Sequence, residues 1–216
     1  MFLSKVSLVR GGSGNLSLLR MQRSGAYAIH QMLWQLFTND EQRLFLFRQE
    51  NTPQNALFYV LSQNAPAHHP EFVVQSKTFL PKLHSGQKLA FNLRANPTVS
   101  LDGKRHDVLM HAKQQARAQG QPEEHAWSTM ERAAQNWLCS KPRLLKWGMS
   151  LDMLPVVDSY VQHRSRKKSG QDISFSSVDY QGVLTVIDVE RFWQQYCQGF
   201  GRAKAMGCGL MLIRHA

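Results

Sequence analysis

The sequence predicts an α+β protein made of two related domains, and three observations support this fold class. A hydrophobic fraction of 43%, with 5 tryptophans and 11 phenylalanines, is enough to form packed cores in a chain of 216 residues. The first half starts with a strand, a helix and two short strands, as a ferredoxin-like domain does. The second half ends with a strand, a helix and a strand, although no sequence repeat relates the halves.

In the first half, residues 2–9 alternate as a strand does, and the glycines of residues 11–14 interrupt them. A helix is expected next. Its apolar residues recur at helical spacing as far as Phe37, and Ser24 is its expected N-cap. Short strands then follow at residues 44–47, 57–61, 72–74 and 89–93.

In the second half, residues 114–138 have a helical pattern that residues 120–122 interrupt. Asp188 is the expected N-cap of a later helix, and Gly199 is its expected stop signal. Strands are expected at residues 156–161, 173–178, 182–187 and 210–213.

The charge of the chain indicates a polyanionic partner. Lysine and arginine number 26 against 15 acidic residues, which gives a formal charge of +11. Residues 1–97 carry 10 basic and 4 acidic residues, and residues 98–216 carry 16 and 11. Because both halves are basic, both are expected to face the same polyanion, with nucleic acid favoured over an anionic membrane.

Several classes of protein are not supported by the sequence. No uncharged apolar run of about 18 residues is present, so a cytoplasmic protein without a membrane span is expected. Cys139, Cys197 and Cys208 have no C-x-x-C spacing and predict neither a disulfide framework nor a zinc site. The histidines form no ligand spacing with them, so no metal ion is expected. No small-molecule cofactor is expected either, because the glycine-rich segment at residues 199–209 does not match a nucleotide-binding motif.

The first helix carries a candidate for catalysis. Tyr27 and His30 are three residues apart and therefore lie on one side of the helix, at the edge of its apolar stripe. An imidazole there can take a proton from a ribose 2′-hydroxyl or give one to a departing 5′-oxygen, and a phenol can assist. The alternative is a surface histidine beside a half-buried tyrosine.

The densest positive cluster, residues 163–171, lies between two predicted strands. A hairpin there could place basic side chains against phosphates, and the alternative is a solvated loop. The candidate RNA-binding residues are Arg164, Arg166, Lys167 and Lys168.

A glycine-rich segment, residues 199–209, precedes the last strand. It fails the G-x-G-x-x-G pattern, because position 204 is lysine, and it lacks the G-K-[ST] ending of a P-loop. Glycines let a backbone approach RNA closely, whereas the alternative is a tight connection between helix and strand. The candidate RNA-binding residues here are Gly199, Gly201, Arg202, Lys204, Gly207 and Gly209.

Four motifs occur together and in order: YAIHQMLWQLF at residues 27–37, LRANP at 93–97, GVLTV at 182–186 and GFGRAKAMGCG at 199–209. In combination they resemble the Cas6e (CasE) family of CRISPR precursor-RNA endoribonucleases from type I-E systems. The resemblance extends from Phe2 to Ile213 and is weak at residues 100–146. It implies two tandem ferredoxin-like (RRM-like) domains. We expect them at residues 1–97, with the catalytic helix, and 98–216, with the basic hairpin and the glycine-rich loop.

The same resemblance implies a metal-independent endoribonuclease that cuts CRISPR precursor RNA at the base of the repeat stem-loop. The 2′-hydroxyl would attack the adjacent phosphorus, leaving a 2′,3′-cyclic phosphate and a 5′-hydroxyl. His30 and Tyr27 match the family's catalytic pair, and Arg94 of the second motif joins the expected RNA-binding residues. The product would stay bound among the other Cascade subunits.

Two other functions remain open. A non-catalytic subunit that binds structured RNA would need the same charge but not His30. A nucleotide-using enzyme built on the glycine-rich segment would bind ATP or NAD, which is not expected.

Overall fold

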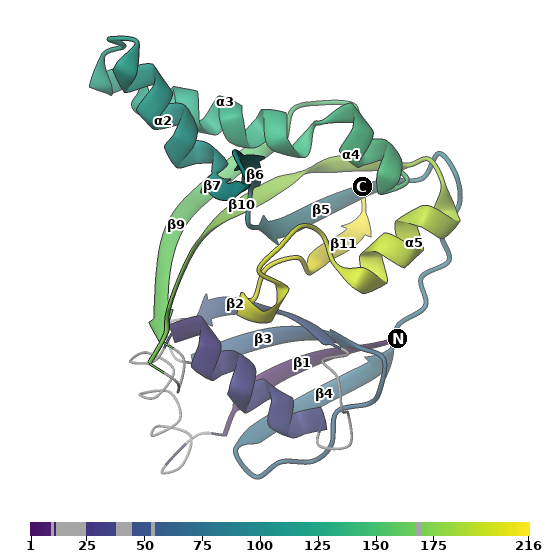
Figure 1. The fold of residues 1–216 in the computed structure, drawn as a ribbon. Helices are drawn as coiled ribbons and strands as arrows, with labels where there is room; N and C mark the ends of the chain where they lie inside the picture. The colour runs from purple at the N-terminus through teal and green to yellow at the C-terminus, as the bar shows by residue number, and fades with distance from the viewer. Residues whose placement is uncertain (10, 12–24, 38–44, 53–54, 167–169) are drawn as a thin grey trace. The chain divides into compact units, whose positions relative to one another are not determined.

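The structure is a computed structural model that describes residues 1–9, 11, 25–37, 45–52, 55–166 and 170–216. The chain divides into two compact units, which are described separately (Figure 1). Unit 1 comprises residues 1–82, 163–174 and 203–210, and unit 2 comprises 83–162, 175–202 and 211–216. Two pieces of the second half of the sequence thus belong to unit 1. The domain limits expected at residues 97 and 98 stay a prediction.

Unit 1 is a four-stranded antiparallel sheet with the strand order β2-β3-β1-β4. This is the ferredoxin-like order, in which β1 and β2 are separated by β3 and joined by a helix. The helix covers residues 25–34 and continues as η1 (Gln35–Phe37). The strands are β1 (Phe2–Leu8), β2 (Phe45–Thr52), β3 (Asn55–Ser62) and β4 (Phe72–Thr78).

The helix of unit 1 packs on one face of this sheet. Leu33 and Leu36 from the helix and Val6 and Phe58 from the strands are all fully buried in one apolar cluster. Burying each such side chain contributes roughly 1.5–3 kcal/mol, so this face holds the unit together. The strands expected here and the helix as far as Phe37 are confirmed. The expected cap Ser24 and residues 12–14 lie outside the described residues.

Unit 2 contains a second antiparallel sheet with the strand order β11-β5-β10-β8, and β9 also pairs with β10. Its central strand β5 lies between β11 and β10, as β1 lies between β4 and β3 in unit 1, so the two ferredoxin-like topologies correspond. The strands are β5 (Lys88–Ala95), β8 (Met149–Leu151), β9 (Val156–Arg166), β10 (Asp172–Val186) and β11 (Met211–His215). The last residues of β9 and the first of β10, within 163–174, belong to unit 1.

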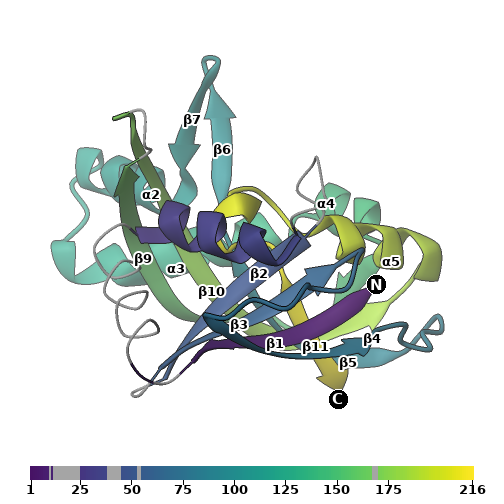
Figure 2. The same cartoon turned by 90° about the horizontal axis from the view of Figure 1, so that it is seen from below.

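The helices of unit 2 agree in part with the prediction. The break at residues 120–122 and the helix between Asp188 and Gly199 are confirmed. The sequence did not predict α4, β8 or the β6–β7 hairpin, and Figure 2 shows this hairpin as a separate two-stranded ribbon. The elements are β6 (Thr98–Leu101), β7 (Lys104–Asp107), α2 (Val108–Ala118), η2 (Glu123–His125), α3 (Ala126–Leu138), α4 (Lys141–Lys146) and α5 (Val189–Gln198), with η3 (Lys204–Met206) in unit 1.

The prediction of two strands at residues 173–178 and 182–187 is wrong, because β10 is one continuous strand. Its middle residues are held on both sides. The buried Tyr180 donates a hydrogen bond from its hydroxyl to the Ala134 carbonyl at 3.0 Å, and Asp179 binds Arg94 of β5. The polar residues that interrupt the apolar pattern of β10 therefore have partners on neighbouring elements and do not form a turn.

No described helix has the length and apolar character needed to cross a membrane.

Asp107 starts α2 earlier than the predicted residue 114. One carboxylate oxygen, Oδ1, accepts from the backbone N–H groups of Leu109 and Met110 at 2.8 and 3.1 Å. The other, Oδ2, accepts from the Tyr160 hydroxyl at 2.9 Å. Burial is the main cause that raises the pKa of Tyr160 to about 12, so this phenol stays protonated and donates.

We predict that Asp107→Ala lowers the free energy of unfolding by about 1–2 kcal/mol, the usual cost of losing an N-cap. Asp107→Asn is the matched control, because asparagine caps helices about as well as aspartate. Urea unfolding followed by circular dichroism measures both variants. Equal losses in the two would show that the cap is not what Asp107 supplies.

Candidate functional site

The start of the helix in unit 1 lies against the β9–β10 hairpin. The Tyr27 backbone N–H donates to the Ser165 hydroxyl at 3.3 Å, across 138 residues of sequence. A Cβ added at Gly25 would lie 3.1 Å from the carbonyl oxygen of Arg164. The first N–H groups of a helix have no acceptor within the helix, and the buried Ser165 supplies the acceptor for one of them. The basic hairpin is thereby attached to the helix that carries His30.

His30 packs among aromatic rings of unit 1. Its ring centroid lies 5.5 Å from Phe45 and 6.3 Å from Phe47 in stacked geometry, and 5.2 Å from Trp34 edge to face. The side chain is 5% exposed. We expected it at the edge of the apolar stripe, and it is more buried than that because the two phenylalanines of β2 cover it. These contacts restrict the orientation of the imidazole.

The second part of the glycine-rich segment reaches the same aromatic rings. Gly207 has φ +84°, and a Cβ added there would lie 3.1 Å from Cε2 of Phe47. Phe47 therefore contacts Gly207 on β2's core-facing side, where its ring also stacks with His30. The helix, the end of the hairpin and residues 203–210 thus converge within unit 1.

Other predicted residues belong to unit 2. Arg94 makes a two-pronged ion pair with Asp179, from Nε at 2.9 Å and from Nη2 at 2.8 Å. Its guanidinium is thus held by an acid in this structure. Gly199 ends α5 with φ +81°, as expected of a stop signal. A Cβ at Gly201 would lie 3.4 Å from Trp137, and Arg202 is exposed.

The remaining predicted residues lie at the hairpin and in unit 1. Arg164 is exposed, and Arg166 is the last residue of β9. Lys204 is half-buried and Gly209 is buried. Lys167 and Lys168 lie outside the described residues.

The sequence reasoning missed the residues that position the candidate site. Phe45 and Phe47 were predicted only as strand residues, although their alternation already placed both on one face. Ser165 gave no signal, because its partner Tyr27 is remote in sequence. Within the described ranges, no three His, Cys, Asp or Glu side chains lie together as metal ligands.

Comparison with known proteins gives consistent results. Residues 1–215 match the family described as CRISPR associated protein. The chain is 32% identical to the CRISPR system Cascade subunit CasE of Escherichia coli, over 99% of this chain and 98% of that one. It is 31% identical to the CRISPR-associated endoribonuclease Cse3 of Thermus thermophilus, over 65% of this chain and 62% of that one. The structure of CRISPR endoribonuclease Cse3 bound to a 19-nucleotide RNA has the same fold, with a TM-score of 0.71, 24% identity and coverage of 99% and 100%.

We predict that Gly207→Ala destabilises the protein by about 1–3 kcal/mol more than Gly120→Ala does. Both glycines have positive φ, +84° and +74°, so both variants carry the same backbone strain. Only the first variant forces a methyl group against Phe47, because nothing lies within 4 Å of a Cβ at Gly120.

Urea unfolding measures the difference in stability. The NMR signals of the His30 ring, assigned by their loss in His30→Ala, should shift in the first variant alone, because Phe47 stacks on that ring. Equal stabilities and an unmoved His30 signal would show that Gly207 is not required next to Phe47.

Proposed function

The chain belongs to the family of CRISPR-associated proteins, and from this membership we propose that it is a metal-independent endoribonuclease. Its substrate is CRISPR precursor RNA, which it cuts at the base of the repeat stem-loop. It then stays bound to the product together with the other Cascade subunits, in the cytoplasm. The match to a Cascade subunit along almost the whole chain supports this proposal.

The reaction is an internal displacement at phosphorus. The 2′-oxygen of the nucleotide before the cut bonds to the adjacent phosphorus, and the bond from phosphorus to the 5′-oxygen breaks. The 2′-hydroxyl loses a proton and the departing 5′-oxygen gains one, so the products are a 2′,3′-cyclic phosphate and a 5′-hydroxyl. A group that titrates near neutral pH can perform either proton transfer.

We assign one of these transfers to His30. The observation that carries the assignment is that His30 lies where the helix, the hairpin end and the segment around Gly207 converge. Its ring is packed against Phe45 and Phe47 and is nearly shielded from solvent. This packing limits exchange of the ring proton with bulk water.

Tyr27 positions the reacting groups or assists the proton transfer. It is half-buried, and its backbone N–H is anchored by Ser165. The position of its side chain is therefore tied to that of the hairpin, so RNA bound along the hairpin would meet Tyr27 in a defined place. The family resemblance supports Tyr27 and His30 as a pair.

RNA recognition is assigned to the basic hairpin and the glycine-rich segment. The major groove of A-form RNA is deep and narrow, so shape and phosphate contacts dominate over base reading. The exposed Arg164 and Arg202 supply charge. The half-buried Gly201 allows close backbone approach, whereas Gly207 and Gly209 are buried. Arg94 can join only if its ion pair with Asp179 opens. The second candidate function, a non-catalytic RNA-binding subunit, uses the same surface without His30.

We predict that intact protein cuts the repeat hairpin once in EDTA, whereas His30→Ala is slower by about 10²- to 10⁴-fold or more. Hairpin affinity should be nearly unchanged, because the variant removes no charge-assisted phosphate contact. His125→Ala is the control, since His125 is an exposed histidine of η2. Gel assays give the rates, and mass spectrometry identifies the 2′,3′-cyclic phosphate. Tight binding without cutting by intact protein would favour the non-catalytic subunit instead.

We predict that neutralising the hairpin weakens RNA binding and flattens its salt dependence. Each phosphate contact that is lost should remove about one unit from the slope of log affinity against log salt. Titrations at several salt concentrations measure this slope. The substitutions are Arg164→Gln, Arg166→Gln, Lys167→Gln and Lys168→Gln.

A control with the same loss of charge tests whether location matters. It replaces four exposed basic residues of unit 2 with glutamine: Lys104, Arg105, Lys141 and Lys146. The control should change the slope less than the hairpin variant does. An unchanged slope in the hairpin variant would remove the hairpin from the RNA interface.

A further inference from the structure

The sheet of unit 1 has a second face, opposite to the one that the helix covers, and this face carries a pocket of about 370 Å³. Its lining comes from three neighbouring strands. Lys5 of β1 is paired with Tyr59 of β3 on one side and with Gln75 of β4 on the other. Leu3 is paired with Lys77 of β4. These residues alternate with the buried core residues and therefore point to the other side of the sheet.

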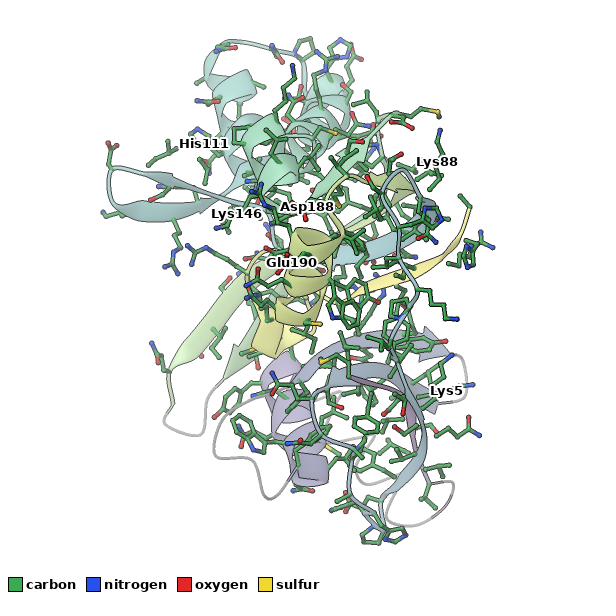
Figure 3. All side chains as sticks on the ribbon, turned by 90° about the vertical axis from the view of Figure 1, so that its right-hand side faces the viewer. Lys5, Lys88, His111, Lys146, Asp188 and Glu190 are labelled. Atoms are coloured by element: carbon green, nitrogen blue, oxygen red, sulfur yellow. The ribbon has the colours of Figure 1, made fainter. Side chains whose placement is uncertain are left out.

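The charged side chains that line this pocket are all positive. Lys5, labelled in Figure 3, and Lys77 are both exposed, and no carboxylate lines the pocket. Among the described residues, neither lysine forms an ion pair with an acid. Lys88 of β5, by comparison, pairs with Asp152 at 3.1 Å. Two lysines without a carboxylate partner on a pocket of a +11 protein are suited to an anion.

The other lining groups suit the remaining parts of a nucleotide. The half-buried ring of Tyr59 lies beside Lys5 in the strand register, on the side away from β4, and offers a face for base stacking. The exposed Gln75 amide can donate to and accept from a base edge or a ribose hydroxyl. The Ser4 hydroxyl donates to the Ser76 hydroxyl at 2.9 Å, which ties β1 to β4 beneath the pocket. The volume lies within the roughly 300–1,000 Å³ range of small-ligand sites.

We propose that the pocket lined by Leu3, Lys5, Tyr59, Gln75 and Lys77 binds single-stranded RNA that flanks the repeat hairpin. The lysines hold phosphates and Tyr59 stacks a base, so the site tolerates sequence variation, as open sheets with an aromatic residue do. The proposal rests on the proposed function for the hairpin. It adds a site for the unpaired strand that no step of the cutting reaction requires.

The test measures binding of three RNAs, each with a 2′-deoxy nucleotide at the cut so that none is cleaved. One is the hairpin alone, and the others carry a single-stranded extension of about ten nucleotides on the 5′ or the 3′ side. Intact protein should bind at least one extended RNA about tenfold more tightly than the hairpin alone. Lys5→Gln with Lys77→Gln should abolish this gain and leave affinity for the hairpin alone unchanged.

Salt dependence separates the two kinds of contact. The double variant Lys5→Gln, Lys77→Gln should reduce the slope of log affinity against log salt for the extended RNA by about 1.4. A single strand contributes about 0.7 per phosphate contact, and the variant removes two contacts. Tyr59→Leu should reduce the gain without changing the slope. Lys104→Gln with Lys146→Gln, in unit 2, removes the same charge and should keep the gain.

The proposal would be overturned if neither extension increased the affinity of intact protein. It would also be overturned if the increase persisted in the double variant Lys5→Gln, Lys77→Gln. Affinity for the hairpin alone reports whether each variant is folded. The cutting assay is separate, because the three RNAs are uncut. A failure of the proposed cutting activity would therefore leave the extension result readable by itself.

Discussion

Phe45 and Phe47 lie two residues apart on β2, so their rings share the core-facing side of the sheet, and the candidate site depends on how these rings pack. They stack against His30 and restrict its orientation. Phe47 also contacts the segment around Gly207, where only a glycine fits without displacing the ring. The same apolar packing that stabilises unit 1 therefore places the imidazole and the glycine-rich segment next to each other. Stability and function share these contacts.

Unit 1 is assembled from three stretches of the chain that are far apart in sequence. Residues 163–174 and 203–210 return to it from the second half, and the hydrogen bond between Tyr27 and Ser165 is one point of attachment. In the proposed function, RNA bound to the hairpin is thereby coupled to the helix that carries His30 through this hydrogen bond. Such an arrangement holds the basic hairpin and the buried His30 in a fixed relation.

The two faces of the sheet in unit 1 have different chemistry, because side chains alternate along each strand. One face is apolar and carries the helix with His30. The other carries Lys5, Lys77 and Tyr59 around an open pocket. If both proposals hold, a single sheet carries the site for cutting a stem-loop on one side and the site for an unpaired strand on the other.

The sequence by itself determined the elements with a local signal. Apolar spacing predicted the helix to Phe37 and most strands, and Asp188 and Gly199 predicted the limits of α5, because periodicity and capping act over a few residues. It did not determine β10. The polar residues Asp179 and Gln181 resembled a turn in the sequence, whereas in the structure both lie in a continuous strand paired with β5. Only the tertiary structure decided that Ser165 meets Tyr27 and that Gly207 meets Phe47. Contacts between distant residues leave no periodic pattern, and they form only when the sheet brings the segments together.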